Sequence, residues 1–275
     1  WKRLHSFLLS IGFVPNKSDV CLYVLHLPGG AYVLLLLYVD DILLAGTSQD
    51  IVTEYTNRIS REFRVSAEGT IRHYLGFDIY IDLTRHRVEL SMTAYIEEMF
   101  KRFRLVPKQS VDTPLPEGII TTLETAELAD DQFADDFEYR QKIGCILYLM
   151  ICMRPDICFA VGFLARYCNK VSRAAAAGVT RLLQYVYNTK EFVLVLGGKN
   201  AYTKAFSDSD WAGDRISRLS TGSYDLYIGD GIVDWGSRRH RLPAQSTAEA
   251  EYLTLNAPAR AILWVRWLLH ETKIK

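Results

Sequence analysis

The chain has 275 residues and a mass of 31.4 kDa, with 49% hydrophobic and 23% charged residues. This composition is that of a globular protein, and it excludes an intrinsically disordered chain and a collagen-like repeat. The formal net charge is zero because 32 Lys and Arg balance 32 Asp and Glu, so the total charge does not indicate a polyanionic partner.

The charge is distributed unevenly along the chain. Residues 111–140 carry nine acidic side chains and one basic side chain, whereas residues 141–275 carry 18 basic and 11 acidic ones. A moderately basic C-terminal half favours a nucleic-acid partner only weakly, because it is common in other proteins too. The length predicts about two domains. We expect the acidic, proline-containing segment 107–136 to be an extended or loosely ordered connector near the boundary between them.

Hydrophobic periodicity predicts a mixed N-terminal part. The chain begins with an amphipathic helix that contains Trp1, Leu4, Leu8 and Leu9. Further on, strands are expected at 20–26, 31–37, 42–45, 74–81 and 87–90, a helix capped by Ser48 at 51–63, and a helix opened by Thr93 at 93–103.

The C-terminal part is predicted to be helical first and then mixed. Helices are expected at 137–152, 155–168 and 173–188, strands at 192–196, 204–207, 223–228 and 232–235, and one long amphipathic helix at 248–270. Trp264 and Trp267 on the last helix are more typical of core residues than of base-stacking surfaces.

Cysteine content and hydropathy indicate a soluble intracellular protein. The five cysteines are expected to be buried free thiols in a reducing compartment: Cys21, Cys145, Cys152, Cys158 and Cys168. The longest apolar run, Ala31–Val39, has nine residues, whereas a membrane-spanning helix needs about 20. No signal peptide is visible, and a chain that starts on Trp1 is expected to be an excerpt of a longer protein.

The first chemical signal is Tyr38-Val39-Asp40-Asp41, which lies between two apolar runs. Two adjacent carboxylates at the bend of a buried hairpin repel each other and cost desolvation energy, so a cation should compensate them. Oxygen ligands of this kind bind Mg²⁺ in phosphoryl-transfer sites. The alternative interpretation is an Asp-Asp turn that faces solvent.

Residues 35–46, Leu-Leu-Leu-Tyr-Val-Asp-Asp-Ile-Leu-Leu-Ala-Gly, resemble the polymerase core of reverse transcriptases from copia-type LTR retrotransposons. The resemblance continues through the motifs at 74–79 (the primer-grip hairpin), 95–103 and 113–115 (the thumb helix and the segment after it), and 139–148 and 154–157 (the helical region between polymerase and nuclease). It implies that Asp40 and Asp41 are catalytic metal ligands, that Leu75 and Gly76 position the primer, and that Tyr38 contacts nucleic acid.

The last third is similar to the ribonuclease H domain of the same polyproteins, in the motifs at 207–214, 220–222, 235–237 and 246–252. That resemblance implies that Asp208 and Glu251 are catalytic and hold two metal ions across the scissile phosphate. Asp210 and Glu249 compete for these roles. Asp208 and Asp210 would share one face of a strand, whereas Glu249 and Glu251 would point to different sides of a helix. If these acidic residues are considered without the other motifs, the preferred interpretation is a solvent-exposed strand end and helix start instead of a metal site.

The sequence also departs from the family pattern. In the family that the chain resembles, a third polymerase Asp would precede Trp1, and further nuclease Asp residues would follow Lys275. Each of the two active sites is therefore expected to have about two of its carboxylates in this sequence. Ala177-Gly178-Val179 stands where the family usually has a His, which suggests a decayed copy. The basic cluster 238–241, with Arg238 and Arg239, either contacts the phosphates of an RNA–DNA hybrid or forms an exposed turn.

The predicted fold class is an α+β reverse transcriptase palm and thumb, a helical connecting region, and an α/β ribonuclease H-like domain, with both catalytic domains truncated. The predicted domains are 1–106 (palm and thumb), 107–136 (acidic connector), 137–190 (helical connecting region) and 191–275 (ribonuclease H-like).

The predicted function is RNA-directed DNA polymerase activity coupled to degradation of the RNA strand of a hybrid. It implies Mg²⁺ or Mn²⁺ as cofactor, deoxynucleoside triphosphates as substrates, and an RNA template, a DNA primer and an RNA–DNA hybrid as partners. The expected location is cytoplasmic, within retrotransposon particles. Two alternatives remain for the excerpt: a non-catalytic fragment or decayed copy that at most binds nucleic acid, and a protein with nuclease activity alone.

Overall fold

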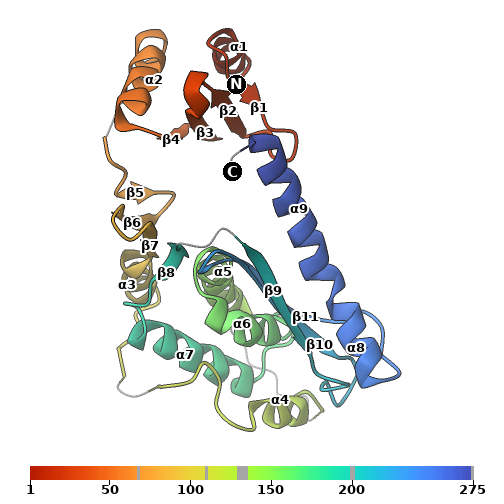
Figure 1. The fold of residues 1–275 in the computed structure, drawn as a ribbon. Helices are drawn as coiled ribbons and strands as arrows, with labels where there is room; N and C mark the ends of the chain where they lie inside the picture. The colour runs from red at the N-terminus through yellow and green to blue at the C-terminus, as the bar shows by residue number, and fades with distance from the viewer. Residues whose placement is uncertain (67–68, 109–110, 129–135, 199–201, 274–275) are drawn as a thin grey trace. The chain divides into compact units, whose positions relative to one another are not determined.

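The computed structural model describes residues 1–66, 69–108, 111–128, 136–198 and 202–273, which form a mixed α/β structure (Figure 1). The chain divides into two compact units. The first contains residues 1–70 and 261–275, and the second contains residues 71–260. This division differs from the predicted domain boundary within 107–136.

The first unit is built on an antiparallel sheet in the order β1-β2-β3-β4. Five of its elements confirm the predicted strands and helices: β2 Leu22–His26, β3 Tyr32–Tyr38, β4 Asp41–Gly46, α1 Lys2–Ser10 and α2 Gln49–Glu62. The short strand β1 Val14–Pro15 was not predicted, and a short η1 Pro28–Gly30 lies between β2 and β3 in the chain. Alternate residues of β3, including Val33 and Leu35, are fully buried and belong to one core with Leu8 of α1 and Ile59 of α2. Ser48 caps α2 as predicted, because its side chain accepts a hydrogen bond from the Ile51 amide.

The predicted helix 248–270 is two helices, α8 Thr247–Thr254 and α9 Asn256–Thr272. Pro258 has no N–H to donate to the Thr254 carbonyl, which explains a break at this point. The predicted burial of Trp264 and Trp267 is wrong, because their exposed fractions are 46% and 62%. The Trp264 indole instead donates to the Ser18 carbonyl at 3.3 Å.

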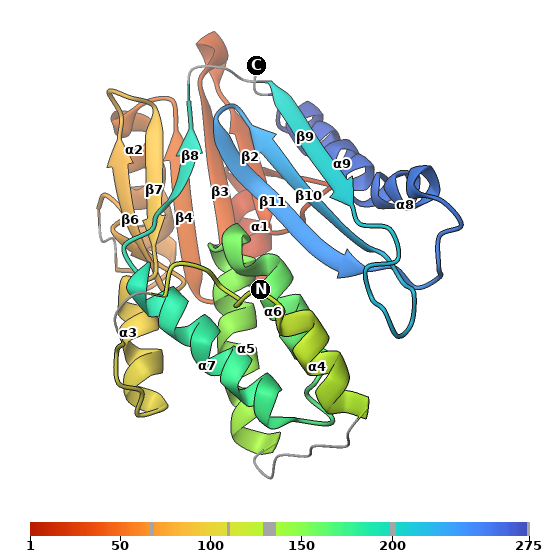
Figure 2. The same ribbon diagram turned by 90° about the horizontal axis from the view of Figure 1, so that it is seen from below.

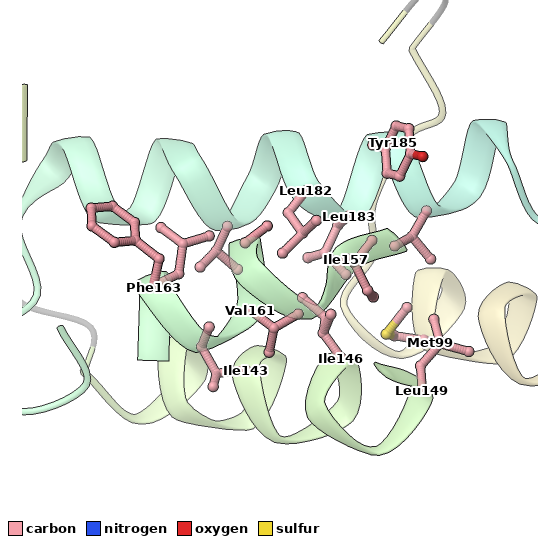
Figure 3. Close-up of a cluster of buried hydrophobic side chains, with 14 of the residues drawn as sticks. Met99, Ile143, Ile146, Leu149, Ile157, Val161, Phe163, Leu182, Leu183 and Tyr185 are labelled. Atoms are coloured by element: carbon pink, nitrogen blue, oxygen red, sulfur yellow. The ribbon is translucent and has the colours of Figure 1, made fainter. Parts of the chain in front are cut away.

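The second unit contains the larger core, which is mainly helical (Figure 3). Its helices are α3 Thr93–Arg102, α4 Ile119–Leu128, α5 Asp136–Cys152, η2 Pro155–Ile157, α6 Cys158–Ala165 and α7 Arg173–Asn188. Ile146 and Leu149 of α5 and Leu182 and Leu183 of α7 are fully buried. The three helices predicted between 137 and 188 are therefore confirmed, except that the second begins with the short η2 turn.

The expectation of an extended connector at 107–136 is wrong for the part that forms α4. Leu123 of α4 is fully buried, and Ile119 packs beside Gly178 of α7. This packing joins segments far apart in the chain, so local composition does not reveal it. Residues 109–110 and 129–135 of the predicted connector lie outside the described residues.

Two antiparallel sheets complete the second unit. The first has the order β5-β6-β7-β8, and the second has the order β11-β10-β9 with α8 packed on β9 and β10. The strands are β5 His73–Tyr74, β6 Phe77–Asp82, β7 Arg87–Ser91, β8 Leu194–Gly197, β9 Thr203–Ser209, β10 Thr221–Ile228 and β11 Gly231–Arg239. The predicted strand 74–81 is a hairpin, because Leu75 and Gly76 form a turn between β5 and β6.

All five cysteines are free thiols, as predicted. The prediction that they are buried holds fully only for Cys158, because Cys21 is exposed and the other three are half-buried. In the part of the chain that the structure describes, no helix has the length and apolar character that a membrane crossing requires.

Candidate carboxylate sites and nucleic-acid contacts

Asp40 and Asp41 lie at the tip of the β3–β4 hairpin. Tyr38 pairs directly with Asp41, so Val39 and Asp40 form the turn between the two strands. Val39 has a backbone φ of 52° and is 82% exposed. A positive φ is rare for a β-branched residue, and such strained positions cluster at functional sites. The turn that carries the two carboxylates is therefore conformationally unusual.

Both carboxylates are exposed, which corrects one argument drawn from the sequence. The expectation of a desolvation cost at a buried bend does not hold, because all four residues from Tyr38 to Asp41 are solvent-accessible. Within the described residues, the side chains of Asp40 and Asp41 make no hydrogen bond or ion pair. Their oxygens are therefore accessible to a cation, and they are of the type that Mg²⁺ prefers.

Leu75 and Gly76 form the tight turn of the β5–β6 hairpin, where Tyr74 pairs with Phe77. Their φ values are 52° and 83°, so both turn residues are left-handed, as in a type I′ turn. The Tyr148 hydroxyl of α5 donates to the Leu75 carbonyl at 3.2 Å. The turn is thus anchored to the helical core of the second unit, whereas Asp40 and Asp41 belong to the first unit.

The structure distinguishes the competing acidic residues of the last third. Glu249 belongs to a capping box at the start of α8: its amide donates to the Ser246 hydroxyl at 3.2 Å, and its carboxylate accepts from the Gln245 amide at 2.7 Å. Asp210 follows β9 and accepts a hydrogen bond from the Thr221 amide. Both residues therefore have structural partners. No hydrogen bond or ion pair of the Asp208 or Glu251 side chain occurs within the described residues, and both are exposed.

Asp208 lies on the face of its sheet opposite to α8. A Cβ atom at Gly222 of β10 would meet the side chain of Thr254 of α8. This side of Gly222 is therefore the sheet face that α8 covers. Ser209 is paired with Gly222 and shares this face, and Asp208 therefore points to the other one. Glu251, in contrast, is on α8 itself. Among the described residues no group of three or more His, Cys, Asp or Glu could hold a metal ion. The metal-binding roles of these carboxylates stay predictions.

Arg238 and Arg239 end the strand β11, paired with Gly222 and Thr221, instead of lying in an exposed turn. Arg239 donates to the Asp214 carboxylate at 2.7 Å, and Arg166, which directly follows α6, lies 3.3 Å from the same carboxylate. This pairing engages the Arg239 guanidinium at the protein surface, where its side chain is 39% exposed, and leaves Arg238 as the more available cation.

Asp214 was not predicted to have a role, because its partners come from distant segments. Burial disfavours its charged form, but the Ser217 amide and the two arginines outweigh this effect and lower the pKa of Asp214 from 3.8 to about 2. The side chain is only 6% exposed. It ties the loop between β9 and β10 to β11 and α6.

Comparison with known proteins assigns the N-terminal part directly. A family model described as reverse transcriptase (RNA-dependent DNA polymerase) matches residues 1–117. No solved structure matches the chain.

Three relatives extend the similarity along the chain. The chain is 28% identical over 98% of its length to the retrovirus-related Pol polyprotein from transposon TNT 1-94 of Nicotiana tabacum. It is 30% identical over 99% of its length to the corresponding polyprotein from transposon RE1 of Arabidopsis thaliana. It spans only 21% and 18% of these two polyproteins. It is also 30% identical to an uncharacterized mitochondrial protein of Arabidopsis thaliana, of which it covers 93%.

The residues that match the family model include the β3–β4 hairpin, which has Tyr38-Val39-Asp40-Asp41 at its tip, and the motifs that follow it. The family match at 1–117 begins before this hairpin and includes the Leu75-Gly76 turn. The chain therefore belongs to the Pol polyprotein family of copia-type retrotransposons and contains part of its reverse transcriptase.

Proposed function

We propose that this chain acts as a segment of a larger Pol polyprotein in RNA- and DNA-templated DNA synthesis. The observation that carries the proposal is the β3–β4 hairpin, which holds the exposed Asp40 and Asp41 on a turn with a strained Val39. The two carboxylates would hold Mg²⁺ or Mn²⁺. A bound metal ion of this kind supplies charge neutralisation for the triphosphate and activation of the primer 3′-hydroxyl.

The other predicted polymerase residues would position nucleic acid. Tyr38 is 54% exposed and lies opposite Asp41 on the same face of the hairpin, which suits contact with a nucleotide near the carboxylates. The Leu75-Gly76 turn would hold the primer end, and the hydrogen bond from Tyr148 would keep that turn in place. The RNA template, the DNA primer, the deoxynucleoside triphosphates and a location within retrotransposon particles belong to the same proposal.

The proposal predicts that Asp40→Asn abolishes DNA synthesis. In the polyprotein that contains this segment, primer extension should fall by roughly 10²-fold or more, because an amide is a poorer ligand for a hard cation. Asp50→Asn in the first turn of α2 is the matched control and should keep nearly full activity. Unchanged primer extension by the Asp40→Asn protein would contradict the assignment.

We propose a second activity, cleavage of the RNA strand of an RNA–DNA hybrid, for the last third of the chain. Asp208 and Glu251 support it, because their carboxylates are exposed and make no hydrogen bond or ion pair with other described residues. In this proposal they would bind the metal ions that orient the attacking water, which requires the Asp208 carboxylate to reach the side of the sheet on which α8 packs. Arg238 would contact phosphate, and Arg239 would do so only if it left Asp214.

Two neighbouring glutamates of α8 give this second activity a matched test. Glu251→Gln should abolish Mg²⁺-dependent cleavage of a labelled hybrid, whereas Glu249→Gln should retain it because the amide oxygen can still accept from the Gln245 amide. The full polyprotein is assayed, with Asp208→Asn as an independent variant. Equal activity of the two glutamine variants would exclude the predicted role of Glu251.

The competing function is nucleic-acid binding without catalysis. It is favoured by one observation: Asp40 and Asp41 are exposed, as they would be in an Asp-Asp turn that faces solvent. A decayed copy would bind RNA or DNA with a steep salt dependence and show no turnover with Mg²⁺ or Mn²⁺. Cleavage of a hybrid without primer extension would instead support a nuclease alone.

A further inference from the structure

Strand β9 carries a row of large side chains that the proposed catalytic roles do not use. Lys204, Phe206 and Asp208 lie at alternate positions of this strand, so they share one face of the sheet. Tyr202 immediately precedes the strand and continues the alternation. Phe206 is 59% exposed and Tyr202 is 47% exposed, and exposed aromatic side chains gathered on one surface are typical of interaction sites.

The neighbouring strand adds a third ring. Tyr227 of β10 pairs with Lys204, and its ring contacts that of Phe206 edge-to-face at 6.0 Å between centroids. The Lys204 Nζ atom lies 5.3, 6.0 and 5.2 Å from the ring centroids of Tyr202, Phe206 and Tyr227. We call these four residues the β9 aromatic row. Cation–π attraction holds the Lys204 ammonium among the rings, so the row presents one positive charge among three aromatic side chains.

The protein covers the other half of this sheet face but leaves the row open. Trp235 of β11 lies on the same face, and its indole donates to the Met150 carbonyl of α5 at 3.0 Å. Gly162 of α6 lies beside the backbone of Ser237. β9 is the outer strand of the sheet (Figure 2), with β10 between it and β11. Helices α5 and α6 therefore cover the side of β11, whereas Phe206 on β9 stays exposed.

We propose that the β9 aromatic row binds a single strand of nucleic acid, with bases stacked on Phe206 and Tyr202 and a phosphate on Lys204. Stacking on aromatic rings beside a basic side chain is how proteins bind single strands of any sequence. The Lys204 ammonium at the centre of the row can pair with the negative charge of a phosphate. An apolar protein surface bound at the same place would bury the ammonium group without a partner, which costs free energy. Alternate strand residues are about 6.6–6.8 Å apart, so the row extends in regular steps away from Asp208.

The inference rests on the proposed function in one respect: it assigns a strand-binding surface next to Asp208. A strand whose phosphodiester reaches Asp208 would continue, unpaired beyond the end of the hybrid, over Phe206 and Lys204 on the same face of β9. Binding itself needs no metal ion. It can therefore be measured in EDTA, separately from any cleavage.

The test measures binding of a short fluorescein-labelled oligouridine to the 275-residue chain by fluorescence anisotropy in EDTA. Phe206→Leu keeps an apolar side chain but removes the ring, and we expect it to weaken binding about tenfold. Phe206→Trp should bind at least as tightly as the unmodified chain. Tyr80→Leu on β6, where the tyrosine is 63% exposed, is the matched control and should have no effect.

A second variant examines the charge. Lys204→Gln should reduce the salt dependence of binding by the equivalent of about one phosphate contact. Lys101→Gln on the exposed face of α3 should leave this dependence unchanged. Thermal melting followed by circular dichroism verifies that each variant is folded.

The outcomes separate this inference from the proposed nuclease activity. If Phe206→Leu binds as the unmodified chain does, or if no binding is measurable, the assignment of the β9 aromatic row is overturned. If the leucine and glutamine variants weaken binding while the tryptophan variant does not, the assignment is supported, whether or not the polyprotein cleaves a hybrid. Failure of cleavage with intact binding contradicts only the nuclease proposal.

Discussion

Single residues decide what the candidate sites can do. Val39 adopts a left-handed conformation that a β-branched residue rarely takes, and this conformation allows a two-residue turn to present Asp40 and Asp41 at the hairpin tip. Glu249 and Asp210 are used for capping and loop closure, although their neighbours Glu251 and Asp208 are chemically identical. Hydrogen-bond partners, not residue type, separate structural from available carboxylates in this chain.

Asp214 makes the stability of the protein dependent on pH. Its pKa is lowered from 3.8 to about 2 in the folded protein. The stabilisation that Asp214 provides is therefore complete at a pH above its pKa in the unfolded chain, and it is lost as the pH falls through its pKa in the folded protein. We expect Asp214 to contribute about 2 kcal/mol to the free energy of unfolding at neutral pH, lost between about pH 4 and pH 2. Urea denaturation at several pH values checks this. The Asp214→Asn protein should lack this component, and an identical acid profile would contradict the prediction.

At the scale of elements, one buried arginine joins η2 to the end of α7. Arg154 makes two hydrogen bonds to the Asp156 carboxylate, at 2.8 and 2.7 Å, and donates to the Thr189 carbonyl at 3.1 Å. Tyr185 donates its hydroxyl to the same carboxylate at 2.9 Å. Burial disfavours the charged form of Asp156, but the hydrogen bonds and charge of Arg154 outweigh it and lower its pKa. Thr189 caps the C-terminus of α7, where a cation is also favourable for the helix dipole.

Removing this arginine should destabilise the second unit strongly. Arg154→Ala leaves Asp156 half-buried without its partner, and we expect a loss of about 3–5 kcal/mol in the free energy of unfolding. Arg154→Lys should recover only part of it, because an ammonium group cannot form the two parallel hydrogen bonds. Urea denaturation provides the measurement, with Arg260→Ala on the exposed face of α9 as control. A loss below about 1 kcal/mol for Arg154→Ala, typical of an exposed pair, would disprove the buried network's role.

At the scale of the whole molecule, the sequence predicts elements better than their packing. Alternation and helical periodicity located β2, β3, β4, α2 and α7, because each buries one regular face. Local pattern did not reveal α4, because its burial depends on α7. The two compact units also could not be predicted, since the first combines the two ends of the chain.

The candidate sites were predictable to a similar extent. The Asp40-Asp41 turn follows from the apolar runs on both sides, and the Ser246-x-x-Glu249 pattern is a capping-box signal that could have distinguished Glu249 from Glu251 at the outset. The sheet face of Asp208 depends on which side α8 packs, and the pairing of Arg239 with Asp214 depends on loop geometry. Neither is encoded in local spacing.

The pairing of β7 with β8 has a consequence for the order of folding. These strands are separated by roughly 100 residues in the sequence. Closing so long a loop costs conformational entropy, whereas the local contacts within a helix do not require such a loop to close. During synthesis, β7 would leave the ribosome long before its partner and would keep an unpaired edge, open to wrong pairing, until β8 emerges. We therefore expect pulse-labelling hydrogen exchange to show protection of the α7 amides before those of β7. Simultaneous protection would instead mean that helices and sheet form in one step.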